Sequence, residues 1–410
     1  MKYGLIGEVL KHSFSKEIHS LIADYDYQLN EIPKDGLDAF MKAKDFLGIN
    51  VTIPYKESVI PYLDVIDESA KSIGAVNTVV NKGGKLYGYN TDFYGLKSLI
   101  EKLNVDITDK TVAILGTGGT SKTAQAVVTS MGAKSVFKVS RTGRNGVKTY
   151  DELYGIADHV DVIINTTPVG MYPNVQNVAV DLTKFPSLIA VVDVIYNPLR
   201  TKLVSDALSI GIKAEGGLYM LVAQAVKASE IFLDTVYDKS VLNGAFEKIY
   251  TEKQNVVLTG MPGSGKSTVG RLLANKLGRK FVDTDELIEK KAGKEITKIF
   301  SEDGEKAFRD LESECIREVS LNTGLIIATG GGAILKGENI KALKQNGKVF
   351  FLDRPLENLI PTSDRPLANT IEQIKKRYNE RYDIYVKTAD ETVDASTDID
   401  GVANTILRSL

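Results

Sequence analysis

The first quarter of the chain alternates short apolar runs with amphipathic stretches. The apolar runs lie at residues 3–9, 27–33 and 47–54, and this rhythm is typical of βαβ units in an α/β layer. Two further apolar runs flank Gly83 and Gly84 within residues 79–89. A glycine pair at that place predicts a hairpin of two antiparallel strands at one edge of the sheet. We expect the first lobe to close near Asn90.

A second α/β unit follows, with strand-like runs at residues 111–115, 135–140, 161–167 and 190–196. They predict the parallel strands of a Rossmann-type sheet. Residues 217–250 are predicted to be helical, because residues 216–233 carry apolar side chains at helical spacing. Residues 243–255 lack a strong period and become polar toward their end, which predicts a linker and a domain boundary near Lys253.

Residues 251–410 again alternate strand and helix and have the length of one domain. The predicted fold class is therefore α/β throughout, in three segments. These are an N-terminal α/β lobe (1–95), a Rossmann domain (96–216) and a further α/β domain (251–410). A length of 410 residues also favours several domains, because one hydrophobic core rarely covers so long a chain.

The net charge and the number of cysteines limit which binding partners and which cellular compartment are expected. A formal net charge of -2 gives no electrostatic reason to expect nucleic acid or an anionic membrane, so small-molecule partners are predicted and the oligomeric state stays open. The single cysteine, Cys315, excludes an intrachain disulfide, favours the cytoplasm and is interpreted as a small buried apolar residue. No apolar run approaches the roughly 20 residues of a membrane span, and Glu8 and Lys11 interrupt any signal-like segment.

A glycine-rich turn follows the first strand of the Rossmann-type segment and opens a helix. Such a turn lets pyrophosphate sit at a helix N-terminus, although tight βα turns also use glycine for purely structural reasons. The turn comprises Gly116, Thr117, Gly118, Gly119 and Thr120.

The residues at the end of the next strand indicate which dinucleotide would bind. An NAD site would be expected to carry an acidic residue there for the ribose 2′-hydroxyl, whereas this chain has VSRTGRN. Cations and hydroxyl donors suit a 2′-phosphate. The sequence therefore predicts NADP(H) rather than NAD, bound through Ser140, Arg141, Thr142 and Arg144.

The segment GMPGSGKS matches the complete P-loop pattern between a predicted strand and a predicted helix. The backbone amides of a P-loop cradle the phosphates of ATP, Lys266 would reach the β- and γ-phosphates, and the Ser267 hydroxyl would join the Mg²⁺ shell. The predicted nucleotide site comprises Gly260, Met261, Pro262, Gly263, Ser264, Gly265, Lys266, Ser267 and Thr268.

An ordered set of motifs over roughly residues 1–250 resembles the signature segments of shikimate dehydrogenases. They are HSFS (12–15), NVTIPYK (50–56), GAVNT (74–78), GYNTDFYG (88–95), NTTPVGM (165–171), DVIYNPLRT (193–201) and GLYMLVAQA (217–225). The resemblance implies that Lys56 and Asp92 form a catalytic pair beside the carbonyl of 3-dehydroshikimate. It also implies that the helices of residues 217–250 return to the first lobe. Met171 would lie at the cofactor, and the substrate would be bound by Ser13, Ser15, Thr52, Asn77, Tyr196 and Gln224.

The pair implied by this resemblance suits a ketone reduction. Hydride reaching a carbonyl carbon leaves negative charge on the oxygen, which a lysine ammonium held by a carboxylate can stabilise and protonate. The step requires no metal. His12, His19 and His159 lack metal-ligand spacing and are interpreted as structural or solvated.

A second ordered set, over roughly residues 255–410, resembles the motifs of shikimate kinases. It comprises FVDTDELIE (281–289), IFSEDGEKAFRDLE (299–312), ATGGGA (328–333), SDRPLA (363–368) and ERYDIYVKTA (380–389). The resemblance implies that residues 251–410 form a P-loop α/β domain of nucleoside-monophosphate-kinase type and that Asp283 lies by Mg²⁺. It implies too that Asp285 binds the acceptor hydroxyls and accepts the proton of the attacking one.

The same resemblance assigns the remaining acceptor contacts. Arg309 and Arg381 would clamp the shikimate carboxylate, because a guanidinium fork matches a carboxylate in a bidentate manner. Arg365 would be the lid arginine, although the segment before it lacks the extra arginines that many members carry. The backbone would approach the substrate closely at Gly330, Gly331 and Gly332.

Together the resemblances imply a bifunctional enzyme. It would reduce 3-dehydroshikimate to shikimate with NADPH and phosphorylate shikimate to shikimate 3-phosphate with ATP, on the route to chorismate and aromatic amino acids. One alternative is a quinate/shikimate dehydrogenase joined to another small-metabolite kinase. Arg141 and the pair Arg309 and Arg381 argue against it. The other is a non-catalytic metabolite-sensing regulator, which would be expected to lack Lys56, Asp92 or Lys266.

Overall fold

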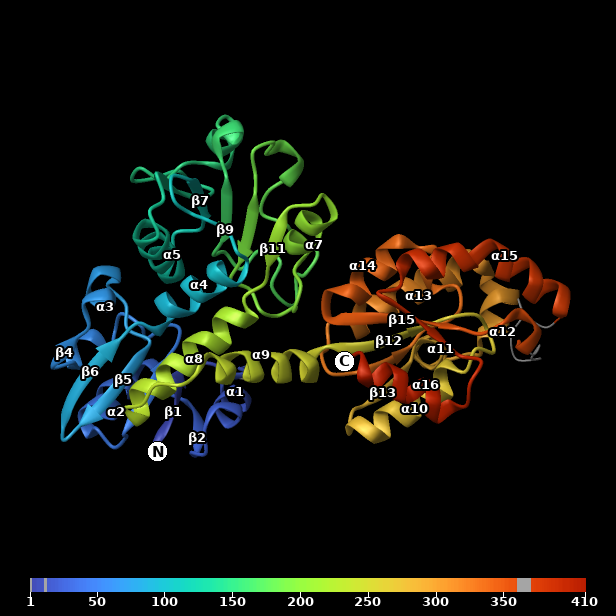
Figure 1. Cartoon of the computed structure of the whole chain (residues 1–410), viewed down its shortest axis with the longest axis horizontal. Helices are drawn as coiled ribbons and strands as arrows, with labels where there is room; N and C mark the ends of the chain where they lie inside the picture. The colour runs from blue at the N-terminus through green and yellow to red at the C-terminus, as the bar shows by residue number, and fades with distance from the viewer. Residues whose placement is uncertain (1, 11–12, 360–369) are drawn as a thin grey trace. The chain divides into compact units, whose positions relative to one another are not determined.

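The computed structural model describes residues 2–10, 13–359 and 370–410. The chain divides into two compact units, Met1–Tyr250 and Thr251–Leu410 (Figure 1). Both units are α/β, as the sequence predicts. No helix within the described residues is long and apolar enough to cross a membrane.

A six-stranded sheet forms the core of the N-terminal lobe. Its order is β2-β1-β3-β5-β6-β4, with β1 parallel to β2 and β3, and β5 antiparallel to β3 and β6. The strands are β1 (Tyr3–Gly7), β2 (Tyr27–Glu31), β3 (Gly48–Val51), β4 (Val65–Ile66), β5 (Thr78–Lys82) and β6 (Lys85–Tyr89). The helices beside them are α1 (Ser15–Ile22), α2 (Leu37–Ala43) and α3 (Glu68–Ile73).

The predicted hairpin exists, but it is not the edge of this sheet. Gly83 and Gly84 turn the chain between β5 and β6 with positive φ angles, which confirms the prediction from the glycine pair. The short strand β4 then pairs in parallel with β6 and becomes the outermost strand. Two residues of strand are too few to produce an apolar period, so the sequence could not place them.

The two faces of the sheet bury alternate side chains. Ile6 and Val79 belong to the cluster on one face, while Leu5 and Val80 pack with Phe232 of helix α8 (Leu218–Leu233) on the other. Successive residues of a strand point to opposite faces, which explains why neighbours in sequence join different clusters. Helix α8 thus lies against this sheet although its sequence follows the second sheet.

The second sheet has five parallel strands in the order β11-β10-β9-β7-β8. They are β7 (Thr111–Leu115), β8 (Ser135–Val139), β9 (Val162–Asn165), β10 (Ala190–Asp193) and β11 (Lys213–Glu215). The four predicted strands are confirmed, and β11 was missed because its KAE sequence is short and polar. The associated helices are α4 (Thr91–Lys102), α5 (Gly119–Ser130), α6 (Tyr150–Tyr154) and α7 (Lys202–Ser209).

The predicted linker at residues 243–255 is wrong, because most of it is helical. Helix α8 ends at Leu233, Asp234 takes a left-handed conformation, and α9 (Lys239–Lys253) then runs almost to the next strand. Leu242, Ala245 and Ile249 lie on one buried face of α9. Three apolar positions on a polar helix give a weak periodic signal, so tertiary burial decides the conformation here.

The second unit is built on a parallel sheet of order β13-β14-β12-β15-β16. Its strands are β12 (Asn255–Thr259), β13 (Phe281–Asp283), β14 (Ile326–Ala328), β15 (Gly347–Asp353) and β16 (Glu391–Asp394). Its helices are α10 (Lys266–Leu277), α11 (Thr284–Ala292), α12 (Ile296–Lys298), α13 (Gly304–Ser320), α14 (Gly337–Asn346), α15 (Ile371–Thr388) and α16 (Ile399–Arg408). Because β12 is central, the turn after it opens in the middle of the carboxyl edge of the sheet.

The structure also settles several single-residue interpretations. Cys315 is buried in an apolar cluster of the second unit, as expected. His19 is buried and stacks on Tyr27 with ring centroids 3.8 Å apart, and burial lowers its pKa to about 3. It is therefore a neutral structural residue, while His159 is exposed and His12 lies outside the described residues.

Candidate active sites

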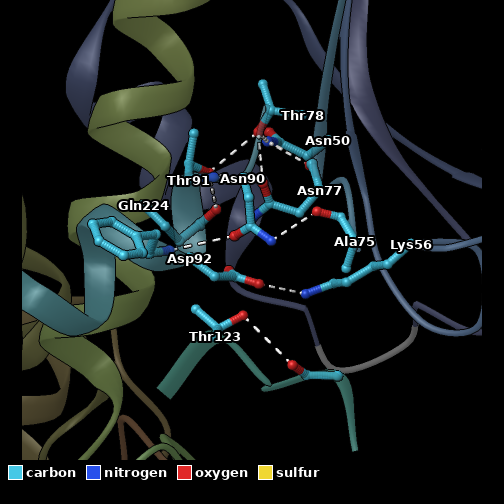
Figure 2. Close-up of polar contacts among 12 residues, drawn as sticks. Asn50, Lys56, Ala75, Asn77, Thr78, Asn90, Thr91, Asp92, Thr123 and Gln224 are labelled. Atoms are coloured by element: carbon cyan, nitrogen blue, oxygen red, sulfur yellow. Dashed lines mark hydrogen bonds and ion pairs between the residues drawn. The ribbon is translucent and has the colours of Figure 1, made fainter. Parts of the chain in front are cut away.

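The N-terminal unit holds a cavity of about 340 Å³ that contains the predicted catalytic pair. Lys56 Nζ lies 2.6 Å from Asp92 Oδ2, and both side chains are mostly shielded from solvent (Figure 2). Lys56 comes from the loop after β3, whereas Asp92 stands in the first turn of α4. The ammonium is thus held at the cavity wall by one carboxylate and can reach a ligand oxygen.

Two buried asparagines position the start of α4, and with it Asp92. Asn90 caps the helix by accepting a hydrogen bond from the Phe93 amide at 3.3 Å, and its own Nδ2 donates to the Ala75 carbonyl at 2.9 Å. Asn77 Oδ1 accepts a hydrogen bond from the Thr91 amide at 2.7 Å. Figure 2 shows this network above the pair of Asp92 and Lys56.

The other predicted substrate ligands of this unit line the same cavity. Ser13 Oγ lies 3.1 Å from Ser15 Oγ, so the two hydroxyls face one another at the start of α1. Gln224 of α8 lies with its Oε1 3.4 Å from Thr91 Oγ1. All of the predicted substrate ligands of this unit line the cavity, namely Ser13, Ser15, Thr52, Asn77, Tyr196 and Gln224.

The glycine-rich turn lies between β7 and α5, as predicted. Gly116 has φ +111, and a Cβ there would lie 2.8 Å from Thr166 Oγ1, so this position requires glycine. A Cβ at Gly118 or Gly119 would meet no atom within 4 Å, which leaves open space over the helix N-terminus. Thr120 lines the cavity that holds Lys56, so the turn and the catalytic pair share one site.

The loop after β8 carries the predicted 2′-phosphate ligands at the surface. Arg141, Thr142 and Arg144 are exposed, and Ser140 is half-buried with its Oγ 3.4 Å from the Gly143 amide that donates to it. Among the described residues, neither guanidinium makes an ion pair or hydrogen bond. Both cations are therefore available to an anionic ligand near the end of β8.

A buried carboxylate behind the cavity had no predicted role. Asp193, at the end of β10, accepts hydrogen bonds from Thr201 Oγ1 at 2.7 Å, from Asn165 Nδ2 at 3.0 Å and from the Ile195 amide at 3.1 Å. Burial raises its pKa to about 6, against the lowering effect of these bonds. Asp193 thereby ties together the loops that follow β9 and β10.

These two loops carry predicted ligands. Met171 lies in the loop after β9 and is 45% exposed, while Tyr196 follows β10 and lines the cavity. Burial raises the pKa of the Tyr196 hydroxyl, so it stays a neutral hydrogen-bonding group. The motif DVIYNPLRT contained Asp193, but only the burial of its carboxylate reveals the link between the two loops.

The second unit holds a separate cavity of about 390 Å³ beside the P-loop. Lys266 is buried and donates to the carbonyl oxygens of Gly260 and Met261, both at 2.9 Å. Positive φ angles at Gly260, Gly263 and Gly265 let the backbone curve around the lysine. Of the predicted nucleotide ligands, Pro262, Lys266 and Ser267 line the cavity, and Thr268 is exposed on α10.

The predicted metal ligands meet at the edge of this cavity. The Ser267 hydroxyl donates to Asp283 Oδ2 at 2.7 Å, and Asp283 Oδ1 caps α11 by accepting from the Asp285 amide at 3.0 Å. The described residues contain no group of three or more acidic, histidine or cysteine side chains that would hold a metal by themselves. One carboxylate and one hydroxyl suit Mg²⁺, which commonly completes its shell with water and phosphate oxygens.

The acceptor side of the cavity brings the remaining predicted residues together. Asp285, Arg309, Arg381 and the three glycines 330–332 all line it. A Cβ at Gly330 would lie 2.5 Å from Asp285 Oδ1, and one at Gly332 would lie 2.2 Å from an Arg309 nitrogen. These glycines therefore make room for the polar side chains that face the cavity. Arg365 lies outside the described residues.

Two residues of this cavity were missed by the sequence analysis. Glu312 is 1% exposed and accepts a hydrogen bond from Arg309 at 2.7 Å, and burial raises its pKa. Arg377 lines the cavity one helical turn before Arg381. The signal available in the sequence was the spacing of three residues from Arg309 to Glu312 and of four from Arg377 to Arg381, which puts each pair on one side of a helix.

Comparison with known proteins relates each of the two units to a protein family. The family profile described as shikimate dehydrogenase substrate binding domain matches residues 5–79, and the profile described as shikimate kinase matches residues 262–410. A Clostridium perfringens protein named shikimate dehydrogenase (NADP(+)) is 39% identical over 264 residues. That match covers 60% of this chain and 97% of the relative.

Two solved structures resemble the first unit. A chorismate mutase/shikimate 5-dehydrogenase fusion protein from Clostridium acetobutylicum has 38% identity and a TM-score of 0.57, covering 60% of this chain and 96% of that chain. Shikimate 5-dehydrogenase from Thermus thermophilus, solved with NADP(H) and shikimate, has 26% identity and a TM-score of 0.55, covering 60% and 99%.

Proposed function

The chain belongs to the shikimate dehydrogenase family and carries a shikimate kinase domain at residues 262–410, and from this we propose a bifunctional enzyme. It reduces 3-dehydroshikimate to shikimate with NADPH and phosphorylates shikimate to shikimate 3-phosphate with ATP, which serves chorismate and aromatic amino acid biosynthesis. The supporting observation is that each unit gathers its predicted substrate ligands around one cavity, with Lys56 and Asp92 in the first and Lys266 and Asp285 in the second. The single cysteine, Cys315, supports a cytoplasmic location.

In the first unit, residues 1–95 with the helices of residues 217–250 bind the substrate, and residues 96–216 bind the cofactor. NADPH supplies the hydride. Lys56, held 2.6 Å from Asp92, donates a proton to the carbonyl oxygen as negative charge develops there. The hydroxyls of Ser13, Ser15 and Tyr196 bind the carboxylate without adding a permanent charge beside Lys56.

The remaining contacts of this unit orient the two ligands. Thr52, Asn77 and Gln224 bind the ring hydroxyls, and the helix N-terminus at Gly118 to Thr120 binds the pyrophosphate. Ser140, Arg141, Thr142 and Arg144 bind the 2′-phosphate, which favours NADPH over NADH. Met171, in the loop after β9, also binds the cofactor.

In the second unit, residues 251–410 hold ATP and shikimate in the cavity beside the P-loop. Lys266 stabilises the negative charge of the transferring phosphoryl group, and Asp285 accepts the proton of the attacking hydroxyl. Arg309 and Arg381 bind the shikimate carboxylate. The predicted lid arginine, Arg365, lies outside the described residues. Ser267 and Asp283 hold Mg²⁺, whose positive charge offsets that of the phosphates.

Product analysis tests both activities at once. The pure protein is incubated with 3-dehydroshikimate, NADPH, ATP and Mg²⁺, beside mixtures that lack one component each. Mass spectrometry should detect shikimate 3-phosphate in the complete mixture and shikimate when ATP is omitted. Absence of both products would favour a non-catalytic regulator. Shikimate without shikimate 3-phosphate in the complete mixture would favour a quinate/shikimate dehydrogenase joined to another kinase.

A further inference from the structure

Three guanidinium groups, rather than the predicted two, line the acceptor cavity of the second unit: Arg309, Arg377 and Arg381. Two of them already have partners. Arg309 donates to Glu312 at 2.7 Å and lies 3.5 Å from Glu305, and Arg381 donates to the Gly331 carbonyl at 3.1 Å. These bonds fix the two side chains at the cavity wall.

Arg377 is the third cation, and it differs from the other two. It lies on α15 one turn before Arg381, so both side chains project from the same side of the helix. The side chain is half-buried. Within the described part of the second unit, it makes no hydrogen bond and no close ion pair. A half-buried guanidinium without a protein acceptor has lost part of its hydration, and an anionic ligand in the cavity would supply the missing acceptor.

The electrostatics of the cavity indicate which ligand that is. Burial lowers the pKa of Arg377, and the positive charges of Arg381 and Arg309 lower it further, although Glu380 and Glu305 oppose this. Arg381 and Arg309 therefore repel Arg377, in a cavity that Asp285 and Glu312 also line. A bound anion would relieve that repulsion, and a carboxylate would match the fork geometry of a guanidinium.

We propose that Arg377 is a further binding residue for the carboxylate of the phosphoryl acceptor. This inference rests on the proposed kinase function of the second unit. Arg377 supplies acceptor affinity rather than phosphoryl-transfer chemistry, because Lys266 and the pair Ser267 and Asp283 lie at the nucleotide side of the same cavity. It also discriminates against neutral analogues of the acceptor, since only an anion gains from a third cation.

The test compares Arg377→Met and Arg377→Lys with wild type in steady-state kinase assays on the full chain. Methionine keeps the apolar stem that packs against the cavity and removes only the charge and the donors. Lys376→Met is the matched control, because Lys376 is exposed on the same helix. We expect Arg377→Met to raise the KM for shikimate about tenfold, which corresponds to ~1.4 kcal/mol. The value of kcat and the KM for ATP should stay within about twofold of wild type, and Arg377→Lys should be intermediate.

The carboxamide of shikimate provides a second readout. Wild type should use the neutral amide poorly, and Arg377→Met should bind it as well as wild type does. A tenfold loss shared by acid and amide would show that the substitution damages the fold, and an effect on the KM for ATP would place Arg377 at the nucleotide; either overturns the inference. If wild type does not phosphorylate shikimate at all, the proposed kinase function fails. If wild type does and the variants match it, only the role of Arg377 fails.

Discussion

Lys56 Nζ and Asp92 Oδ2 lie 2.6 Å apart although 36 residues separate them in the chain. The loop after β3 supplies the ammonium and the first turn of α4 supplies the carboxylate. This contact places a proton donor in the cavity that the glycine-rich turn also borders through Thr120.

Substitution of Lys56 should remove the reduction chemistry. We expect Lys56→Met to lower kcat for 3-dehydroshikimate reduction by about 10²- to 10⁴-fold, the usual contribution of a positioned acid. Kinase activity should stay at the wild-type level. NADPH oxidation and ADP formation measured on the same protein check both statements. Lys71→Met, which changes an exposed lysine of α3, is the control and should match wild type.

Substitution of Lys266 should have the reciprocal effect. The buried ammonium of Lys266 lies within the P-loop, so Lys266→Met should abolish ADP formation and leave NADPH oxidation unchanged. Lys341→Met alters an exposed lysine of α14 in the same unit and should leave both rates intact. Loss of both activities on either Lys56→Met or Lys266→Met alone would refute the assignment of one activity to each unit.

Arg141 should control the choice between the two nicotinamide cofactors. Removing one charged contact to a 2′-phosphate costs about 1.5 kcal/mol or more, so Arg141→Gln should raise the KM for NADPH about tenfold. The KM for NADH, which lacks this phosphate, should not change. Arg144→Gln on the same loop provides the comparison. A rise confined to Arg144→Gln would move the assignment away from Arg141.

The glycine at position 332 should matter through its neighbour Arg309. A Cβ there would lie 2.2 Å from an Arg309 nitrogen, so Gly332→Ala should displace this guanidinium and raise the KM for shikimate severalfold. Gly337→Ala is the matched control, because a Cβ at Gly337 would meet no atom within 4 Å. Equal kinetics for the two variants would show that Arg309 does not need its present position.

Asp193 should make the stability of the first unit depend on pH. Burial raises its pKa from 3.8 to about 6, so the folded protein binds this proton more tightly than the unfolded chain does. The stabilising contribution is complete below pH 3.8 and is lost as the pH rises through about 6. Raising a pKa by about 2 corresponds to roughly 3 kcal/mol.

Asp193→Asn cannot titrate and provides the comparison. Its melting temperature relative to wild type should therefore increase between about pH 5 and about pH 7.5. The transition of the first unit is identified in thermal unfolding of the full chain by its shift on adding NADPH. A melting-temperature difference that is independent of pH would contradict a raised pKa at Asp193.

Much of this architecture can be predicted from local sequence. A buried parallel strand produces a continuous apolar run, which is why β7, β9, β10 and β12 were placed correctly. The P-loop is equally recognisable, because phosphate binding imposes its glycines and Lys266 within eight consecutive residues, GMPGSGKS. The motif resemblances then indicated the families of both units, since each is an ordered set of short segments.

What the tertiary structure decided depends on contacts between distant segments. The weak periodicity of residues 243–255 predicted a linker, but burial of Leu242, Ala245 and Ile249 makes residues 239–253 helical. The role of Asp193 appears only once the ends of β9 and β10 lie side by side. Arg377 is an ordinary helical arginine until Arg309 and Arg381 are seen around the same cavity. Local sequence encodes periodicity and phosphate-binding turns, whereas burial and the approach of like charges exist only in the folded chain.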